Sequence, residues 1–280
     1  MKLANLDGRL VIVDGVRAVD VERASGGEFL ADPQAMYERW DAFVEWATSV
    51  DPAVGDPFDP SRLGPPVPRP AQVFAIGVNY AEHAAEAGYP RDSLPVTFTK
   101  FPSCLTGPLA TVTLPSEFVD WEVELVVAVA RRADRVSRDD AWKYVAGYTI
   151  GQDLSERHVQ LEGTKPQFSL GKSYRGFGPT GPWLVTLDEF ADASDLAIQC
   201  GVEGETLQQG RTSSMIYDVP ELIARLSAVC TLFPGDIIFS GTPSGVGNAR
   251  TPQRFLAADD VLVSSIEGIG SMTTTFVVAS

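Results

Sequence analysis

Apolar and turn residues alternate at the start of the chain in a pattern that predicts a small antiparallel sheet. Asp-Gly turns at residues 7–8 and 14–15 separate short apolar runs, of which 10–13 and 16–19 flank the second turn. Two extended runs joined by Asp-Gly are typical of a β-hairpin. We therefore expect residues 1–20 to form short paired strands.

A helical pattern follows these strands. Apolar residues recur at helical spacing at Met36, Trp40, Phe43, Val44 and Ala47. The preceding Asp-Pro pair, Asp32 and Pro33, is placed to cap this helix and to occupy its first position. We expect one helix that packs behind the hairpins.

Prolines mark a boundary between residues 51 and 70. This stretch contains three Asp-Pro pairs and ends in Pro65-Pro66-Val67-Pro68-Arg69-Pro70, which resists both helix and central strand. We divide the chain here into a small N-terminal α+β domain with its linker, residues 1–70, and a second domain, residues 71–280.

The second domain is expected to be mainly β. From Val73 onward, short β-rich segments are separated by Gly and Pro, as at 74–78, 125–129 and 236–239. One clear helix is predicted from about Pro220, where Asp218 and Glu221 have the spacing of a capping box. Its apolar residues share one stripe: Leu222, Ile223, Leu226, Val229 and Cys230. The fold class is therefore α+β, predominantly β.

Charge and composition exclude several classes of protein. The 22 Lys and Arg against 37 Asp and Glu leave a net charge of −15, and the pI is near 4.5. This field would repel nucleic acid or an anionic membrane. No apolar run approaches the roughly 18 residues of a membrane span, and the start of the chain has no signal-peptide core. We expect a cytoplasmic protein that binds neither nucleic acid nor membrane.

Three cysteines, Cys104, Cys200 and Cys230, stand far apart without paired metal-type spacing. Three cannot all pair within one chain. We expect them to be reduced, buried and inert.

Acidic residues at two places suggest a cation site. On an extended strand, Glu122 and Glu124 would share one face while Val123 and its apolar neighbours point to the other. Asp153 follows a second strand-like segment, where loops gather polar groups. Three carboxylates suit Mg²⁺, Mn²⁺ or Ca²⁺ rather than zinc. The alternative is an edge strand with a solvated acidic face, and the distance between the three acids separates the two interpretations.

Three further residues could carry chemistry. His83 and Glu86 are three residues apart, so on a helix the carboxylate would lie beside the imidazole and raise its basicity, as a general base requires. A surface helix with an incidental pair is the alternative. Lys172 lies in a glycine-flanked, β-rich setting where it could stabilise an oxyanion or enolate, although an exposed lysine is the default.

Taken in chain order, these pieces closely resemble the fumarylacetoacetate hydrolase family over about residues 71–280. The matching stretches are Gly77-Val78-Asn79-Tyr80 with His83 and Glu86, Phe98-Thr99-Lys100 leading to Gly107-Pro108, Glu122-x-Glu124-Leu125, Gly147-Tyr148 with Asp153 and Arg157-x-x-Gln160, Gly171-Lys172-Ser173, Gly178-Pro179-x-Gly181-Pro182-Trp183, Pro234-Gly235-Asp236-Ile237-Ile238 and Gly241-Thr242-Pro243-x-Gly245-Val246-Gly247. His158 departs from the acid that family members often carry there, and residues 1–70 lie outside the resemblance.

The resemblance implies a mixed β-sandwich roll, usually a homodimer, and a set of functional residues. It implies an Mg²⁺ or Mn²⁺ ion held by Glu122, Glu124 and Asp153. It also implies a water-activating pair on a lid that orders over the substrate, His83 and Glu86, with Lys172 at the reacting oxygen. Substrate contacts are implied for Arg157, Gln160 and Thr242.

The predicted activity is metal-dependent hydrolysis of a carbon–carbon bond in a small-molecule keto acid. The substrate would be a 2,4-dioxo acid of the acylpyruvate or fumarylpyruvate type, cleaved through a stabilised enolate. The alternative on the same fold is isomerisation or decarboxylation of 2-hydroxy-2,4-dienedioate or oxaloacetate-like acids. A second class, a non-catalytic binding protein with structural Ca²⁺, would leave the histidine–glutamate pair and Lys172 without a role.

Overall fold

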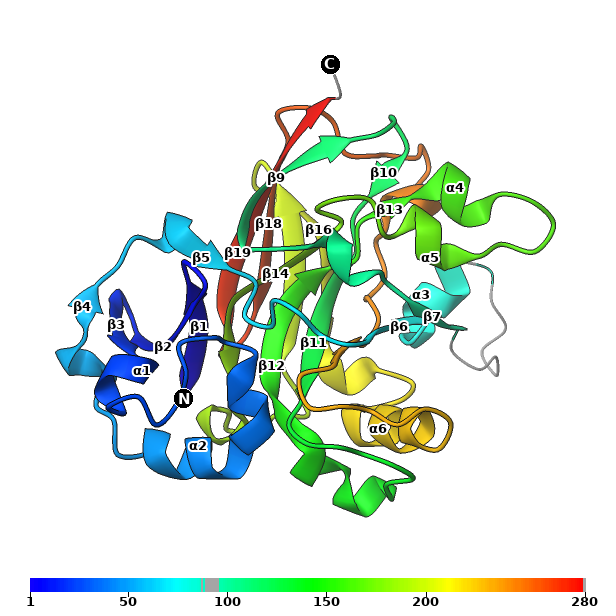
Figure 1. Ribbon diagram of the computed structural model, residues 1–280. Coiled ribbons are helices and arrows are strands. Elements are labelled where there is room, and N and C mark those ends of the chain that lie inside the picture. The colour runs from blue at the N-terminus through cyan, green and yellow to red at the C-terminus, as the bar shows by residue number, and fades with distance from the viewer. Residues whose placement is uncertain (87, 89–95, 279–280) are drawn as a thin grey trace.

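The computed structural model describes residues 1–86, 88 and 96–278 (Figure 1). A 12-stranded mixed sheet dominates this part of the chain. Its strands lie in the order β4 (Asp56–Pro57), β3 (Arg17–Asp20), β2 (Arg9–Asp14), β1 (Lys2–Leu6), β14 (Gly178–Val185), β12 (Val145–Gln152), β11 (Val123–Val129), β17 (Ile237–Phe239), β6 (Val73–Gly77) and β7 (Val96–Thr99), with β5 (Leu63–Gly64) on β1 and β8 (Leu105–Thr106) on β14.

Two smaller sheets complete the described strands. A five-stranded sheet has the order β16 (Glu205–Arg211), β15 (Ala197–Val202), β18 (Val261–Ile266), β19 (Gly270–Val278) and β9 (Leu109–Leu114). A short pair joins β10 (Val119–Asp120) to β13 (Ser155–Glu156). The predicted fold class, α+β and predominantly β, is confirmed.

The helices are short. The α-helices are α1 (Val21–Ala24), α2 (Trp40–Ala47), α3 (Ala81–Glu86), α4 (Arg157–Leu161), α5 (Phe168–Gly171) and α6 (Val219–Ser227). The 3₁₀ helices are η1 (Ala35–Arg39), η2 (Pro52–Val54), η3 (Pro60–Arg62), η4 (Pro102–Cys104), η5 (Arg138–Tyr144), η6 (Leu187–Glu189), η7 (Thr212–Ser214) and η8 (Gly247–Ala249). Among the described helices, none is both long and apolar enough to cross a lipid bilayer.

Strand β11 is buried on both faces, and it separates two apolar cores. Val123, Leu125 and Val127 point into a core that they share with the five-stranded sheet. Val126 and Ala128 point into a second core, which includes residues of α2. This alternation confirms the predicted strand and places Glu124 among the side chains of the second face.

The N-terminal strands continue the large sheet. Strand β1 pairs with β14, Leu3 lying opposite Leu184, and Figure 1 shows β1, β2 and β3 in blue on one side of the molecule. Phe43 of α2 packs in the same apolar core as Val126 and Phe239. The domain boundary at residue 70 stays a prediction.

Two helix predictions need correction. The helix predicted to start at Pro33 with Asp32 as its cap begins instead at Ala35 as a 3₁₀ helix, with Gln34 at its N-cap, and becomes α-helical at Trp40. Asp32 accepts the Gln34 N–H at 3.0 Å in the turn that precedes the helix. The second helix, α6, is capped as predicted, because Asp218 accepts the Glu221 N–H at 3.0 Å. Its correction concerns the other end.

The apolar stripe of α6 is shorter than predicted. Leu222, Ile223 and Leu226 are buried, but α6 ends at Ser227, which leaves Val229 86% exposed. Cys230 is exposed for the same reason, whereas Cys104 and Cys200 are free and buried as expected. The prediction that all three cysteines are buried is therefore wrong for Cys230.

We expect Phe43→Ala to lower the free energy of unfolding by about 3–5 kcal/mol, because Phe43 is fully buried and truncation leaves a cavity. Since its core spans both sides of residue 70, urea unfolding followed by circular dichroism and tryptophan fluorescence should show one transition. Val54→Ala, at a side chain that is 77% exposed, is the control. Separate transitions for the two probes would show that the N-terminal part unfolds independently.

Candidate active site

Three carboxylates meet where β11 and β12 pair. The antiparallel register sets Val123 opposite Gln152, so Glu122 and Asp153 extend to the same end of the sheet, and the Asp153 N–H donates to the Glu122 carbonyl at 2.9 Å. Oxygens of Glu122, Glu124 and Asp153 lie within 4.8 Å of one another, and all three residues are buried. The sequence-predicted acids therefore share one site, and the solvated acidic edge is excluded.

Two buried lysines contact this cluster. Lys172 Nζ donates to Glu122 Oε2 at 2.8 Å, to Asp153 Oδ2 at 2.7 Å and to Ser155 Oγ at 2.7 Å. Lys100 Nζ donates to Asp153 Oδ1 at 2.6 Å and to the Lys172 carbonyl. Each lysine is almost inaccessible to solvent. Lys172 is thus no default surface lysine, because all three of its ammonium hydrogens face buried oxygens.

The predicted β-rich setting of Lys172 is wrong. Lys172 follows helix α5 directly as its C-terminal cap. The preceding Gly171 packs on the backbone of Gln160, where a Cβ would lie 2.6 Å from the Gln160 nitrogen. Only glycine permits this approach of α5 to α4, and the approach brings the lysine to the acids.

Neighbouring charges move the pKa values of the two glutamates in opposite directions. Burial raises the pKa of Glu122, but Lys172 and Arg157 outweigh it and bring that pKa to about 2. Burial also raises the pKa of Glu124, and the charges of Asp153 and Glu122 raise it further. Glu124 accepts the Gly241 N–H at 2.8 Å, and among the described residues we find no ion pair to it. Its charge is the least compensated of the three.

His83 and Glu86 form the predicted pair on helix α3. His83 Nδ1 and Glu86 Oε1 are 2.7 Å apart, and His83 is 7% exposed. A carboxylate can only accept, so a neutral His83 carries its hydrogen on Nδ1 and presents Nε2 as the base. Glu86 also accepts the Gly245 N–H at 3.0 Å. The pair is thereby held in a defined orientation, which disfavours the incidental surface pair.

One cavity of about 220 Å³ joins these groups. Its polar lining includes His83, Glu86, Glu122 and Lys172. Apolar lining comes from Val78, Leu161, Phe168, Val246 and Ala249. A general-base pair and part of the acidic cluster therefore face the same small space, which could hold a compact organic acid.

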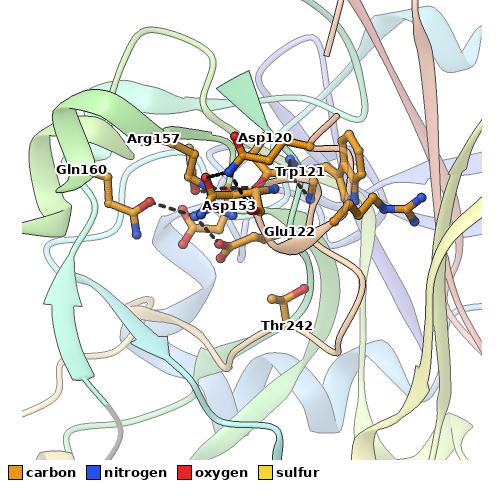
Figure 2. Close-up of polar contacts among 12 residues, drawn as sticks. Asp120, Trp121, Glu122, Asp153, Arg157, Gln160 and Thr242 are labelled. Carbon is orange, nitrogen blue, oxygen red and sulfur yellow. Dashed lines mark hydrogen bonds and ion pairs between the residues drawn. The ribbon is translucent and has the colours of Figure 1, made fainter. Parts of the chain in front are cut away.

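The predicted substrate-contacting residues differ in position. Arg157 and Gln160 line the cavity, and Arg157 Nη1 lies 2.8 Å from both Gln160 Oε1 and Glu122 Oε1. Thr242 does not line it. Its hydroxyl donates to the Val123 carbonyl and accepts from Gln208, each at 2.8 Å. Figure 2 shows Thr242 apart from the ion pairs that surround Arg157.

Sequence reasoning missed two residues of the site. Lys100 directly follows β7, and it was recognised only as part of the family-like stretch 98–100, because its charge and spacing alone do not distinguish it from an exposed lysine. The second missed residue is Asp120, whose Oδ2 lies 2.6 Å from Arg157 Nη2. A signal for Asp120 was present, because Asp120, Glu122 and Glu124 recur with the period of two that an extended strand requires.

The cluster fits a divalent cation by the chemistry of its donors. Three buried carboxylates offer hard oxygen ligands, and the cluster contains neither the cysteine nor the histidine that zinc prefers. Glu124 lacks a cationic partner among the described residues, so a bound ion would offset the charge that its neighbours leave uncompensated. Glu122, Glu124 and Asp153 would hold such an ion.

Known proteins are similar to this chain in sequence. The family profile of the fumarylacetoacetate (FAA) hydrolase C-terminal domain matches residues 72–277. The mitochondrial oxaloacetate tautomerase FAHD2A of Bos taurus is 43% identical over 207 residues, which cover 73% of this chain and 66% of that protein. The 2,4-didehydro-3-deoxy-L-rhamnonate hydrolase of Sphingomonas sp. (strain SKA58) is 44% identical over 214 residues, 75% of this chain and 74% of that one. The chain thus spans slightly less than two thirds of the length of the tautomerase.

Solved structures share the fold over the whole chain. A candidate HpcE protein from Mycobacterium smegmatis is 51% identical with a TM-score of 0.95, and both chains are covered completely, at 100%. Maleylpyruvate hydrolase from Sphingobium sp. SYK-6, in complex with manganese(II) ion and pyruvate, is 29% identical with a TM-score of 0.83, again at 100% coverage of each chain. The chain belongs to the fumarylacetoacetate hydrolase family.

Proposed function

We propose that the protein is a metal-dependent hydrolase that cleaves a carbon–carbon bond in a 2,4-dioxo acid of the acylpyruvate or fumarylpyruvate type. One observation carries this proposal. The oriented His83–Glu86 pair lines the same cavity as Glu122 of the acidic cluster and Lys172. The manganese and pyruvate in the maleylpyruvate hydrolase structure support a metal and a 2-oxo acid in a related site.

The proposed reaction begins with proton transfer to His83. Nε2 accepts a proton from water while Glu86 holds the imidazole through Nδ1, and the resulting hydroxide attacks the C4 carbonyl. Collapse of the alkoxide breaks the C3–C4 bond and leaves the electron pair on the pyruvate fragment as an enolate. One carboxylic acid and one pyruvate result from one dioxo acid and one water, once C3 has taken up a proton.

The enolate is the species that the site must stabilise. Lys172 places a buried positive charge beside Glu122 and Asp153. Arg157 lines the cavity, where it would bind a carboxylate of the substrate. A Mg²⁺ or Mn²⁺ ion held by the three acids would supply Lewis acidity to the 2-oxo oxygen. One such electrostatic contact is typically worth about 3 kcal/mol of transition-state stabilisation.

A second candidate is isomerisation of a related keto acid without cleavage. The specific observation in its favour is the 43% identity to an oxaloacetate tautomerase. The same His83–Glu86 pair could move a proton between the enol oxygen and C3, so the polar groups would be shared. Decarboxylation of an oxaloacetate-like acid would likewise pass through an enolate, and the three reactions differ in whether oxygen from water enters the product.

We propose that the protein is a homodimer that associates through the outer face of its five-stranded sheet. Four outward-facing apolar side chains, Leu109, Val261, Val263 and Val277, are exposed there. The outward positions of β15, β18, β19 and β9 carry no charged residue among those described, and threonine, serine, glutamine, alanine and glycine fill the rest. Arg211 is exposed on the edge strand β16. Two copies with a net charge of −15 repel each other, so a face without charges on four of its five strands favours a second copy.

The absence of nucleic-acid and membrane partners and the cytoplasmic location stay predictions.

We expect His83→Ala to lower turnover of 2,4-dioxo acids by at least about a hundredfold while Mn²⁺ still binds, because only the base is removed. The assay runs in ¹⁸O-labelled water with mass spectrometry of the products. His158→Ala is the control, since His158 stacks on Phe118 at the surface. Label in the non-pyruvate acid supports hydrolysis. Unlabelled decarboxylated or isomerised products would instead favour the second candidate.

Removal of the metal should abolish activity, and Glu124→Gln should weaken Mn²⁺ binding strongly. The substitution keeps the shape of the side chain but removes the carboxylate that has the least compensation within the protein. Calorimetric titration of the chelator-treated enzyme measures the affinity, and Glu45→Gln at an exposed position is the control. Equal Mn²⁺ affinity in Glu124→Gln would remove Glu124 from the ligand set.

Val263→Lys should dissociate the dimer, because an isologous interface receives each new charge twice. Light scattering after size-exclusion chromatography measures the mass, against the 30.1 kDa of one chain. Val54→Lys, at an exposed site of the N-terminal part, serves as the matched variant. A wild-type mass of one chain, or an intact dimer in Val263→Lys, would contradict the proposed interface.

A further inference from the structure

The Asp120 carboxylate joins two parts of the cavity wall that are far apart in sequence. Asp120 ends strand β10 and is fully buried. Its Oδ1 accepts the Gly247 N–H at 2.7 Å, and its Oδ2 accepts the Asn248 N–H at 2.9 Å. The same Oδ2 accepts Arg157 Nε at 2.8 Å and lies 2.6 Å from Nη2. One side chain therefore holds a loop and a guanidinium together.

The loop that Asp120 holds carries part of the cavity lining. Val246, Asn248 and Ala249 face the cavity. Between them, Gly247 packs so closely that a Cβ would lie 2.8 Å from Asp120 Oδ1 and 1.9 Å from the Arg254 carbonyl oxygen. The backbone thus presses against the carboxylate, and glycine is required for this approach.

The loop also contacts the histidine pair. The Gly245 N–H donates to both oxygens of Glu86, at 3.1 and 3.0 Å. Gly245 lies two residues before Gly247, which Asp120 holds. Displacement of the loop would therefore move the donor that helps orient Glu86.

On its other side Asp120 fixes the plane of Arg157. A guanidinium is planar and donates along two edges. Asp120 occupies one edge, while Gln160 and Glu122 lie at Nη1 of the other, each at 2.8 Å. Figure 2 shows Arg157 between Asp120 and these partners. With Nε and Nη1 held, the guanidinium has one orientation relative to the cavity, and Nη2, which has no hydrogen-bond partner in the described part of the chain, is left to donate to a substrate.

We propose that Asp120 is a positioning residue that orients Arg157 for the substrate carboxylate and anchors residues 245–249 beside Glu86. It touches neither the substrate nor the reacting atoms. This inference rests on the proposed function, because it assigns the substrate carboxylate to Arg157. It differs from a purely structural role in one respect: the effect of Asp120 on substrate affinity passes through Arg157.

A double-mutant cycle tests this route. Asp120→Asn keeps the size of the side chain but removes its charge and turns an N–H₂ group or a single oxygen toward Arg157. We expect KM to rise roughly tenfold to a hundredfold, as for loss of a charged hydrogen bond, with a smaller change in kcat. In an Arg157→Gln background the same substitution should change KM little, because the guanidinium through which Asp120 affects substrate binding is already absent. Asp195→Asn, which breaks an exposed pair with Arg211, is the matched control.

Amide hydrogen exchange at Gly247 and Asn248 provides a readout that does not depend on turnover. Exchange should be faster in both Asp120→Asn and Arg157→Gln, because each substitution loosens the carboxylate that accepts these N–H groups. If the wild-type enzyme converted no keto acid, the proposed function would fail. Faster exchange in Arg157→Gln would then still support the connection that Asp120 makes between Arg157 and residues 245–249. Unchanged exchange would overturn it.

Three results would overturn the positioning role in an active enzyme. The first is additive effects of Asp120→Asn and Arg157→Gln on KM. The second is a loss of kcat at unchanged KM. The third is failure of both Asp120→Asn and the double variant to fold, which would assign Asp120 a structural role.

Discussion

The site depends on the mutual compensation of charges that are buried together. Taking a carboxylate or an ammonium out of water costs several kcal/mol, which only close, well-oriented partners offset. Here Lys172 donates to both Glu122 and Asp153. Lys100 donates to Oδ1 of Asp153, the oxygen that Lys172 does not contact. Arg157 forms an ion pair with Glu122. Each side chain is held where it is because another charge would otherwise be left without a partner. The resulting rigidity is what a preorganised catalytic site requires.

The scaffold supports this cluster with two apolar cores rather than one. Strand β11 contributes Val123, Leu125 and Val127 to one core and Val126 and Ala128 to the other. A strand packed on both faces has little freedom to shift, so Glu122, directly before β11, and Glu124, at its start, are fixed relative to Asp153, which directly follows β12. The second core includes α2, which gives the N-terminal residues a part in holding the catalytic strand.

Membership of the family does not by itself choose among reactions. The relatives and the solved structures include a tautomerase and hydrolases. A shared fold hosts several reactions when they have a step in common, which in the proposed function is stabilisation of an enolate. The His83–Glu86 pair serves hydrolysis and isomerisation alike, since an oriented imidazole can act on water as well as on a C–H or O–H bond, and the proposal of hydrolysis assigns it to water.

The amino-acid sequence by itself determined several local elements and the identity of most of the charged groups in the site. The period of two around Glu122 and Glu124 and the helical spacing of His83 and Glu86 are local, so backbone geometry alone relates those side chains. The Asp-Gly hairpins and the Asp218 cap followed from the same kind of local rule.

Tertiary structure decided everything that depends on residues far apart in the chain. Lys100 looks like any surface lysine until the fold brings it to Asp153 and the Lys172 carbonyl. Val229 and Cys230 continue the apolar stripe in sequence, but they are exposed because α6 has already ended. Whether a charged side chain is buried, paired or exposed depends on the residues that pack against it. The spacing of residues along the sequence does not specify those neighbours.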